Sequence, residues 1–387
     1  MPRNINPETE RGGGIINKVR IHQARIVTGA LRCALRQVAN RLCFCLMAML
    51  FLAAPCFAEE PRPTYREYAG SFFLPFVRGS SFESQLSVRV RINGGPIVRL
   101  ELDTGSTGVV LGQGLVRPID RSGPPDEFTY TSSGQVHHGV RNDVRIEFVD
   151  GRGLGPMRGK APIVTIPALI VTHVTCQPAP FPDACHAGQV YKRPAMMGIG
   201  FGGIDQNAFL NFDAMKNGQM RRGFIIEPDG IRIGLTADDV APGFFFVKLD
   251  RPAQPDARRL WALPAANLRA KLPDGKQYDA RGRALPDTGI RGMFLALPGA
   301  PASGMIPPGT QVSVAPEWIG GRGPEIRFSL AERRALTPMA RGAHWVRMAP
   351  DSVSGEPMPF INTGLRPLGA YRILYDADGG YWGLMPR

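Results

Sequence analysis

The tripeptide Asp-Thr-Gly occurs twice in this 387-residue chain, at residues 103–105 and 287–289. The two aspartates lie 184 positions apart, which is about the length of one domain. Two carboxylates held close together cannot both ionise easily, so they share a proton and can act as a paired acid and base. The repeated motif therefore predicts two similar lobes, which deliver Asp103 and Asp287 to a shared cleft.

The segments before and after each motif have the alternation of β-strands. Residues 86–92 and 97–102 alternate apolar and polar side chains around an Asn-Gly-Gly turn, which predicts a hairpin whose second strand ends at Asp103. A second hairpin is predicted from Phe128 to Val149. One helix is predicted in this half, from Asn207 to Asn217, with Gly218 as its C-cap.

The second half repeats this organisation. A turn at residues 273–275 separates two strand-like runs that lead to Asp287, and a hairpin over residues 371–384 mirrors the hairpin at residues 223–235. With 46 glycines, 36 prolines and 20% charged residues, the composition favours a loop-rich β protein over a helical one.

The N-terminus resembles an export signal. Three arginines up to Arg41 precede the apolar run 42–54, which is too short for an ordinary membrane span, and a small residue, Ala58, precedes two glutamates. We expect cleavage after Ala58 and a periplasmic or secreted location. The stretch before Arg32 is long for a signal peptide, so either the start codon is placed too early or the segment stays as an inner-membrane anchor.

The net charge gives little reason to expect nucleic-acid binding. Of the 46 Lys and Arg and 33 Asp and Glu residues, eight and two lie in residues 1–58, which leaves +7 of the total +13 for the rest. No Lys/Arg run with interleaved aromatic residues is apparent, so a mildly basic surface is favoured over nucleic-acid binding.

Two cysteines remain beyond the leader, Cys176 and Cys185, flanked by His173 and His186. A His/Cys quartet at these spacings is compatible with zinc. An exported chain meets an oxidising compartment, however, and a disulfide places no demand on the histidines. We favour a disulfide and expect no metal.

Over residues 86–387 the chain resembles the pepsin-like aspartic peptidases, in a divergent bacterial form. The resemblance rests on both Asp-Thr-Gly motifs, the apolar-apolar-Gly turn at 196–198, the run from Trp261 to the second motif, and the closing segment 370–384. It implies an all-β fold, a bilobal double β-barrel with a few short helices and the active-site cleft between the lobes. We expect a leader at 1–58, an N-terminal lobe at 59–242 and a C-terminal lobe at 243–387.

The resemblance implies hydrolysis of peptide bonds by a water activated between Asp103 and Asp287, one ionised and the other protonated. It implies that Thr104 and Thr288 brace the two loops across the lobe interface, and that Gly105 and Gly289 let backbone approach the carboxylates. We expect a polypeptide substrate, no cofactor and a monomer.

Three positions depart from this pattern or extend it. Ser106 is placed to donate a hydrogen bond to Asp103, whereas Ile290 at the corresponding position cannot donate, which predicts a dyad that works at mildly acidic to neutral pH. Tyr130 lies on the hairpin where the family places a substrate-covering flap, although an ordinary strand tyrosine remains an alternative. The second apolar-apolar-Gly turn is replaced by Asn362-Thr363-Gly364.

Two other functions are compatible with parts of this pattern. A non-catalytic, peptide-binding envelope protein could use the same scaffold, since fold alone does not fix function. The retention of both aspartates argues against it. A glycosidase also uses a carboxylate pair, but its carboxylates need no Thr-Gly context.

Overall fold

The computed structural model describes residues 62–387, apart from 81–84, 119–121, 155–158, 160–161, 181, 202, 241, 253–259, 331–341, 351–352 and 354. The expected leader at 1–58, with its cleavage after Ala58, lies outside the described residues. Among the residues that are described, the strands form three sheets of seven, eight and eight strands. The predicted all-β, two-lobed architecture with a few short helices is confirmed.

The first eight-stranded sheet belongs to the first half of the chain and has the order β5-β6-β2-β3-β10-β4-β8-β9. An additional pairing of β6 with β8 closes six of these strands into a barrel. The strands are β2 (Ser87–Ile92), β3 (Ile97–Asp103), β4 (Thr107–Gly112), β5 (Pro125–Tyr130), β6 (Gln135–Phe148), β8 (Ile163–Cys176), β9 (Gly188–Gln189) and β10 (Ala195–Ile199).

The second eight-stranded sheet belongs to the second half and has the order β17-β20-β16-β21-β15-β14-β18-β19. Its strands are β14 (Ala265–Lys271), β15 (Gln277–Leu285), β16 (Met293–Ala296), β17 (Gly304–Met305), β18 (Gln311–Pro316), β19 (Ile326–Ser329), β20 (Ala343–Trp345) and β21 (Phe360–Asn362).

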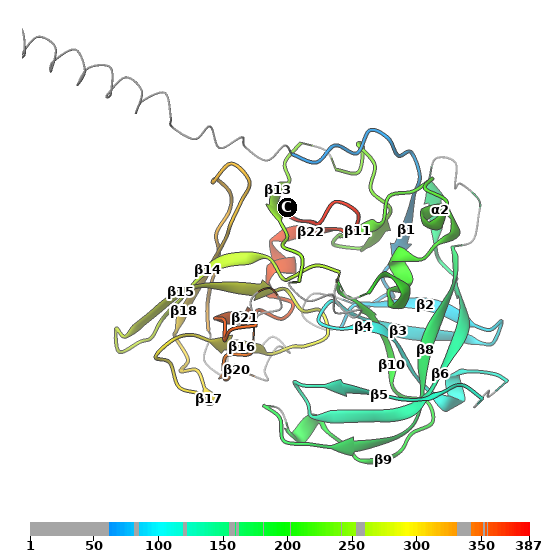
Figure 1. Ribbon diagram of the computed structural model, residues 1–387, viewed down its shortest axis with the longest axis horizontal. Helices are drawn as coiled ribbons and strands as arrows, with labels where there is room; N and C mark the ends of the chain where they lie inside the picture. Colours follow the sequence, from blue (N-terminus) through cyan, green and yellow to red (C-terminus); the bar gives the residue numbers. More distant parts are fainter. Residues whose placement is uncertain are drawn as a thin grey trace, which may run out of the picture. The chain divides into compact units, whose positions relative to one another are not determined.

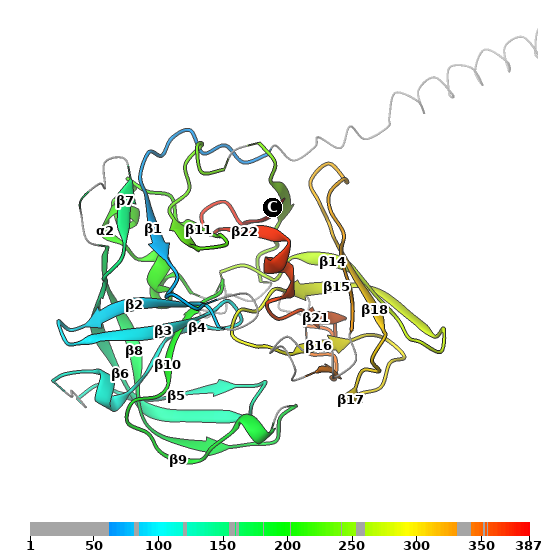
Figure 2. The same ribbon diagram turned by 180° about the vertical axis from the view of Figure 1, so that it is seen from behind.

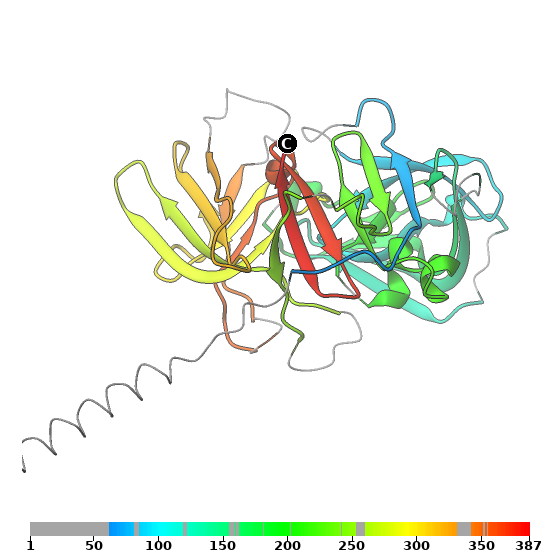
Figure 3. The same cartoon turned by 90° about the horizontal axis from the view of Figure 1, so that it is seen from above.

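The seven-stranded sheet takes strands from both halves, in the order β13-β23-β22-β11-β12-β1-β7. Figures 1 and 3 show β11 and β22 between the two eight-stranded sheets. Its strands are β1 (Ser71–Pro75), β7 (Arg152–Leu154), β11 (Gly223–Ile226), β12 (Gly230–Ile233), β13 (Phe245–Lys248), β22 (Tyr371–Asp376) and β23 (Tyr381–Pro386).

The junction between β11 and β22 is where the halves join. Phe224 lies opposite Tyr375 in the register, and their rings stack with centroids 4.8 Å apart. Next to this pair, the fully buried Asp376 accepts two hydrogen bonds from Arg221 and one from Tyr65. A buried carboxylate is stable only when it is paired and hydrogen-bonded, so this cluster fixes the segment around Tyr65 to the shared sheet.

The alternation read from the sequence decides which face of each strand is buried. In β2, Val88, Val90 and Ile92 are buried while Arg89 points outward, and Asn93 and Gly94 adopt the positive φ angles that the predicted turn requires. The second predicted hairpin is β5–β6, and the terminal pair β22–β23 was also predicted.

The predicted helix at 207–217 is broken. The structure has a 3₁₀ turn, η5 (Ala208–Leu210), and one α-helical turn, α2 (Asp213–Lys216), because Phe212 between them is extended and buried. The other short helices are η1 (Gln113–Leu115), η3 (Pro182–Ala184), η4 (Ile204–Gln206) and η6 (Arg366–Gly369). None of the helices in the described part of the chain is long and apolar enough to cross a membrane.

Candidate active site

The two Asp-Thr-Gly loops emerge from equivalent positions in the two eight-stranded sheets. Asp103 is the last residue of β3, and β10 lies between β3 and β4, parallel to the first and antiparallel to the second. Asp287 follows β15, and β21 lies in the same way between β15 and β16. Each aspartate is therefore carried by a loop whose two flanking strands are held by a third strand.

The threonines connect the two loops by a reciprocal set of hydrogen bonds. The Thr104 N–H donates to Thr288 Oγ1 and the Thr288 N–H donates to Thr104 Oγ1, both at 2.9 Å. Each hydroxyl in turn donates to a carbonyl of the other lobe, Thr104 to Pro286 at 2.6 Å and Thr288 to Leu102 at 2.8 Å. These four bonds make the position of one aspartate depend on that of the other.

The glycines face the carboxylates across the lobe interface. A Cβ atom at Gly105 would overlap the carboxylate of Asp287, and one at Gly289 would overlap the carboxylate of Asp103. Each glycine N–H also donates to the aspartate of its own motif, at 2.7 Å for Gly105 and 2.8 Å for Gly289. The two carboxylates are thus packed against opposing backbone, with room for no side chain between.

Each aspartate receives one further donor, but from different parts of the two lobes. The Ser106 hydroxyl donates to Asp103 Oδ2. The Asn362 amide donates to Asp287 Oδ2 at 2.6 Å, and its Oδ1 accepts the Gly364 N–H at 2.9 Å, which fixes the orientation of the amide. Ile290 cannot donate, as the sequence indicated, but Asp287 still has a side-chain donor, which comes from the end of β21.

Burial controls the charge of the pair. Asp103 and Asp287 are 4% and 5% exposed. Burial and then the charge of Asp287 raise the pKa of Asp103 well above its usual range, against the hydrogen bond from Ser106. Burial also raises the pKa of Asp287, opposed first by the Asn362 amide and then by the hydrogen bond with Asp103. Burial and mutual repulsion therefore disfavour the state in which both carboxyls are ionised, and favour one proton shared by the pair.

Tyr130 lies close to the first aspartate. It ends β5, at the turn to β6, and its hydroxyl is buried without a hydrogen-bond partner among the described residues. Burial first, and then the charges of Asp103 and Glu101, raise the pKa of Tyr130. Ser106 lies near enough to lower that pKa but outside hydrogen-bond geometry. Tyr130 is therefore within electrostatic range of Asp103 and Ser106.

Cys176 and Cys185 form a disulfide, so neither sulfur is available as a metal thiolate. His173 stacks on His138 instead, with ring centroids 4.6 Å apart. Over the described part of the chain, no group of three or more His, Cys, Asp or Glu side chains has the arrangement of a metal site.

Arg291, four residues after Asp287, reaches across to the first lobe. Its Nη2 donates to Gln85 Oε1 at 3.4 Å, and the Gln85 amide donates to Glu101 at 2.7 Å. Within the described residues Arg291 forms no ion pair, because the only acceptor it meets is a neutral amide. A partly buried cation thus lies between the lobes beside the second motif.

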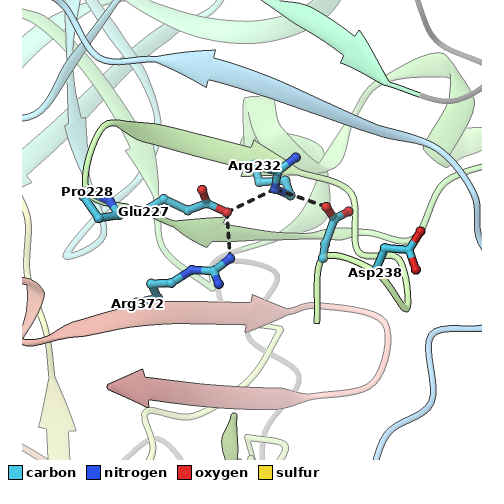
Figure 4. A pocket seen from close by; sticks show the side chains of 6 residues that line it. Glu227, Pro228, Arg232, Asp238 and Arg372 are labelled. Atoms are coloured by element: carbon cyan, nitrogen blue, oxygen red, sulfur yellow. Dashed lines mark hydrogen bonds and ion pairs between the residues drawn. The ribbon is translucent and has the colours of Figure 1, made fainter. Parts of the chain in front are cut away.

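A hollow of about 430 Å³ lies on the shared sheet, away from the aspartates, and is drawn in Figure 4. Glu227 accepts from Arg232 at 3.0 Å and from Arg372 at 2.8 Å, and Arg232 also meets Asp239 at 3.1 Å. Since these charges are already paired within the protein, the cluster is structural and is not a second candidate site.

Sequence reasoning named the two motifs and missed the role of Asn362. The residue was noted only as a polar replacement in an otherwise apolar turn. The register supplies what was missing: Asn362 pairs with Leu285, two residues before Asp287, just as Met196 pairs with Glu101, two residues before Asp103. The signal in the sequence was the polar Asn362 in a turn whose counterpart, Met196 in the first lobe, is apolar; the register that gives Asn362 its role is visible only in the structure.

Comparison with known proteins gives one kind of match. No protein-family model matches the chain, and no curated protein matches it in sequence. Among solved structures, the fold is similar to that of an aspartic proteinase from Irpex lacteus. The match has 13% sequence identity and a TM-score of 0.46, and it covers 82% of this chain and 97% of that chain.

Proposed function

We propose that the chain is an aspartic endopeptidase in which Asp103 and Asp287 activate one water for attack on a peptide bond. The observation that supports this most directly is the cross-packed pair itself. Two buried carboxylates are held by opposing glycines and by reciprocal threonine bonds, and their environments separate their pKa values. Pairs of titratable groups with separated pKa values are suited to acid–base catalysis.

The separation assigns the roles. Asp287, ionised, takes a proton from the water, whose oxygen attacks the carbonyl carbon. Asp103, protonated, gives its proton to the carbonyl oxygen as the tetrahedral intermediate forms. When the C–N bond breaks, the proton held by Asp287 passes to the leaving nitrogen and Asp103 recovers its own from the intermediate. The carboxyls act by proton transfer alone while the O–C bond forms and the C–N bond breaks, and no covalent enzyme intermediate forms.

The substrate is a polypeptide, and Tyr130 is proposed to lie over it on the β5–β6 hairpin. The lobes of this proposal are residues 59–242 and 243–387, and the leader at 1–58 directs export, which the disulfide supports because such bonds persist in oxidising compartments. N-terminal sequencing of the exported protein tests the leader: a first residue of Glu59 supports cleavage after Ala58, and an intact leader supports an anchor.

Activity is tested with the purified full chain on a pool of quenched fluorescent peptides, with and without pepstatin. Asp103→Asn and Asp287→Asn are each expected to lower kcat/KM by about 10³-fold or more, because each removes one partner of the acid–base pair. The matched control is Asp143→Asn, an exposed aspartate on β6, which should leave cleavage unchanged.

The result also separates the alternative function. A non-catalytic scaffold would bind peptides without cleaving them, and the two variants would bind as the unmodified chain does. Cleavage that survives in both variants would exclude the dyad as the catalytic pair.

A further inference from the structure

The hairpin that carries Tyr130 is connected to the disulfide loop by a chain of polar contacts, which runs from the part-buried Gln135 to the buried His137. Figure 2 shows β5 and β9 at the same end of the first-lobe sheet, which is the end that carries this loop. The loop is residues 176–185, closed by Cys176 and Cys185. Its Gln177 N–H donates to the Gly134 carbonyl at 2.9 Å, which joins it to the turn at residues 131–134 between β5 and β6.

A second connection runs through side chains. The Gln135 amide nitrogen donates to the Ala184 carbonyl at 2.7 Å, just before Cys185. The amide oxygen of Gln135 is 2.8 Å from His137 Nε2. Because the amide nitrogen is used by a carbonyl, the oxygen faces the histidine, so His137 Nε2 carries the proton and Nδ1 does not.

His137 in turn packs against Tyr130. The ring centroids are 5.1 Å apart and the planes meet at 71°, an edge-to-face contact, and Phe128 adds a similar contact at 4.8 Å. His137 is 2% exposed, and its Nδ1 is buried with no hydrogen-bond partner among the described residues. A neutral imidazole therefore fits this site, whereas an imidazolium would bury an N–H without an acceptor.

We propose that Gln135 and His137 are positioning residues, which transmit the fixed position of the disulfide loop to Tyr130 and hold its ring beside Asp103 while His137 is neutral. The proposal rests on the proposed function, since it assigns these residues to the hairpin that covers the substrate. Neither side chain is a catalytic residue, because their contacts lead to Tyr130 and not to the reacting atoms.

The charge requirement gives the hairpin a pH dependence. The titratable groups around His137 are His138, its neighbour along the strand, and Tyr130 on β5, while Phe128 on β5 and Val174 on β8 pair with His137 in the sheet. His138 itself lies 3.4 Å from Glu127 and stacks on His173. Burial first and then His138 lower the pKa of His137 to about 4. When the hairpin is open, His137 binds a proton below about pH 6.5. When the hairpin is closed, His137 stays neutral down to about pH 4. Opening therefore becomes easier as the pH falls through this window.

The test is a double-mutant cycle on the full chain with His137→Ala and Tyr130→Ala, measured as kcat and KM at neutral pH. His137→Ala is expected to lower kcat/KM about tenfold, mainly through KM, and to have less than a twofold effect once Tyr130 is already alanine. Gln135→Ala, a milder change on the surface side of the network, should behave in the same way. His138→Ala, the adjacent histidine that stacks on His173, is the matched control. Additive effects of His137→Ala and Tyr130→Ala would overturn the proposal.

Hydrogen exchange supplies a readout that needs no activity. His137→Ala, Gln135→Ala and reduction of the disulfide should each speed exchange of the amides of residues 125–135, and His138→Ala should not. In the unmodified chain this exchange, corrected for intrinsic chemistry, should rise between pH 6.5 and 4.5, and His137→Phe should abolish the rise. If no peptide is cleaved, the proposed function fails and exchange alone decides the positioning role; unchanged exchange in the variants rejects it.

Discussion

The two lobes build the same loop in two chemically different ways. In the first lobe the second donor to the aspartate comes from the loop itself, through Ser106 three residues after Asp103. In the second lobe that position is Ile290, and the donor comes from the neighbouring strand through Asn362. In the first lobe the loop position is polar (Ser106) and the strand position is apolar (Met196). In the second lobe the loop position is apolar (Ile290) and the strand position is polar (Asn362).

This difference shows what the site requires and what it leaves free. Features that span the lobe interface are the same on both sides: each threonine bonds to the other, and each glycine faces the opposite carboxylate. The side-chain donor within each lobe differs, since any buried donor at the right distance satisfies a carboxylate oxygen. The interface is therefore the symmetric part of the site, and the side-chain donors are the part that differs, although each donor lowers the pKa of its own aspartate.

The largest expected effect comes from breaking the symmetric part. Gly105→Ala and Gly289→Ala each place a methyl group where the opposite carboxylate lies, so both should lower kcat/KM by about 10²-fold or more, since small misplacements of a catalytic pair have effects of this size. Gly369→Ala, where a Cβ meets nothing within 4 Å, is the control. A strong loss in one variant and none in the other would show that the interface is not equivalent on its two sides.

Removing the two side-chain donors one at a time should move opposite limbs of the pH profile of kcat/KM. Asn362→Ala removes a donor that lowers the pKa of Asp287, so that pKa rises and the acid limb of kcat/KM moves to higher pH. Ser106→Ala removes a donor that lowers the pKa of Asp103, so the alkaline limb moves to higher pH. Each change should also lower the maximum about tenfold. The assignment of Asp287 as base fails if Asn362→Ala moves only the alkaline limb.

The sequence was sufficient for features with a local signal. Alternation predicted the strands on either side of Asp103, and the Asn-Gly turn predicted their hairpin. The helix at 207–217 was predicted from local propensity, and buried Phe212 interrupts it, which is a tertiary effect. Asn362 is 75 residues from Asp287, and its role depends on strand register, which no local pattern contains. Contacts of this kind set the electrostatics of the site.

A smaller effect is expected from the residue four positions after each aspartate, which follows Ser106 in the first lobe and Ile290 in the second. Arg291 in the second lobe corresponds in spacing to the uncharged Thr107 in the first, so at this one position the second lobe carries a positive charge and the first does not. We predict that peptides with Asp or Glu near the scissile bond are cleaved about three- to tenfold faster than matched amides, roughly the net value of one ordinary hydrogen bond. Arg291→Gln should remove this preference, and Arg269→Gln, on an exposed part of β14, should keep it. Equal rates for acidic and amide peptides in the unmodified chain would contradict the prediction.

The smallest expected effect concerns stability, and it compares the two aspartates directly. The pKa of each is raised by burial in the folded state, so each contributes stability that is present below its unfolded pKa near 4 and lost as the pH rises through its folded pKa. An asparagine cannot ionise, so an Asp→Asn variant does not lose this stability as the pH rises. Asp103→Asn should therefore raise Tm by about 2 °C at pH 7 and leave it unchanged at pH 3.5, and Asp287→Asn should give a smaller rise, because the pKa of Asp287 is raised less. Scanning calorimetry at the two pH values measures both, with Asp143→Asn as the exposed control. A larger rise for Asp287→Asn would place the shared proton on Asp287 and exchange the acid and the base.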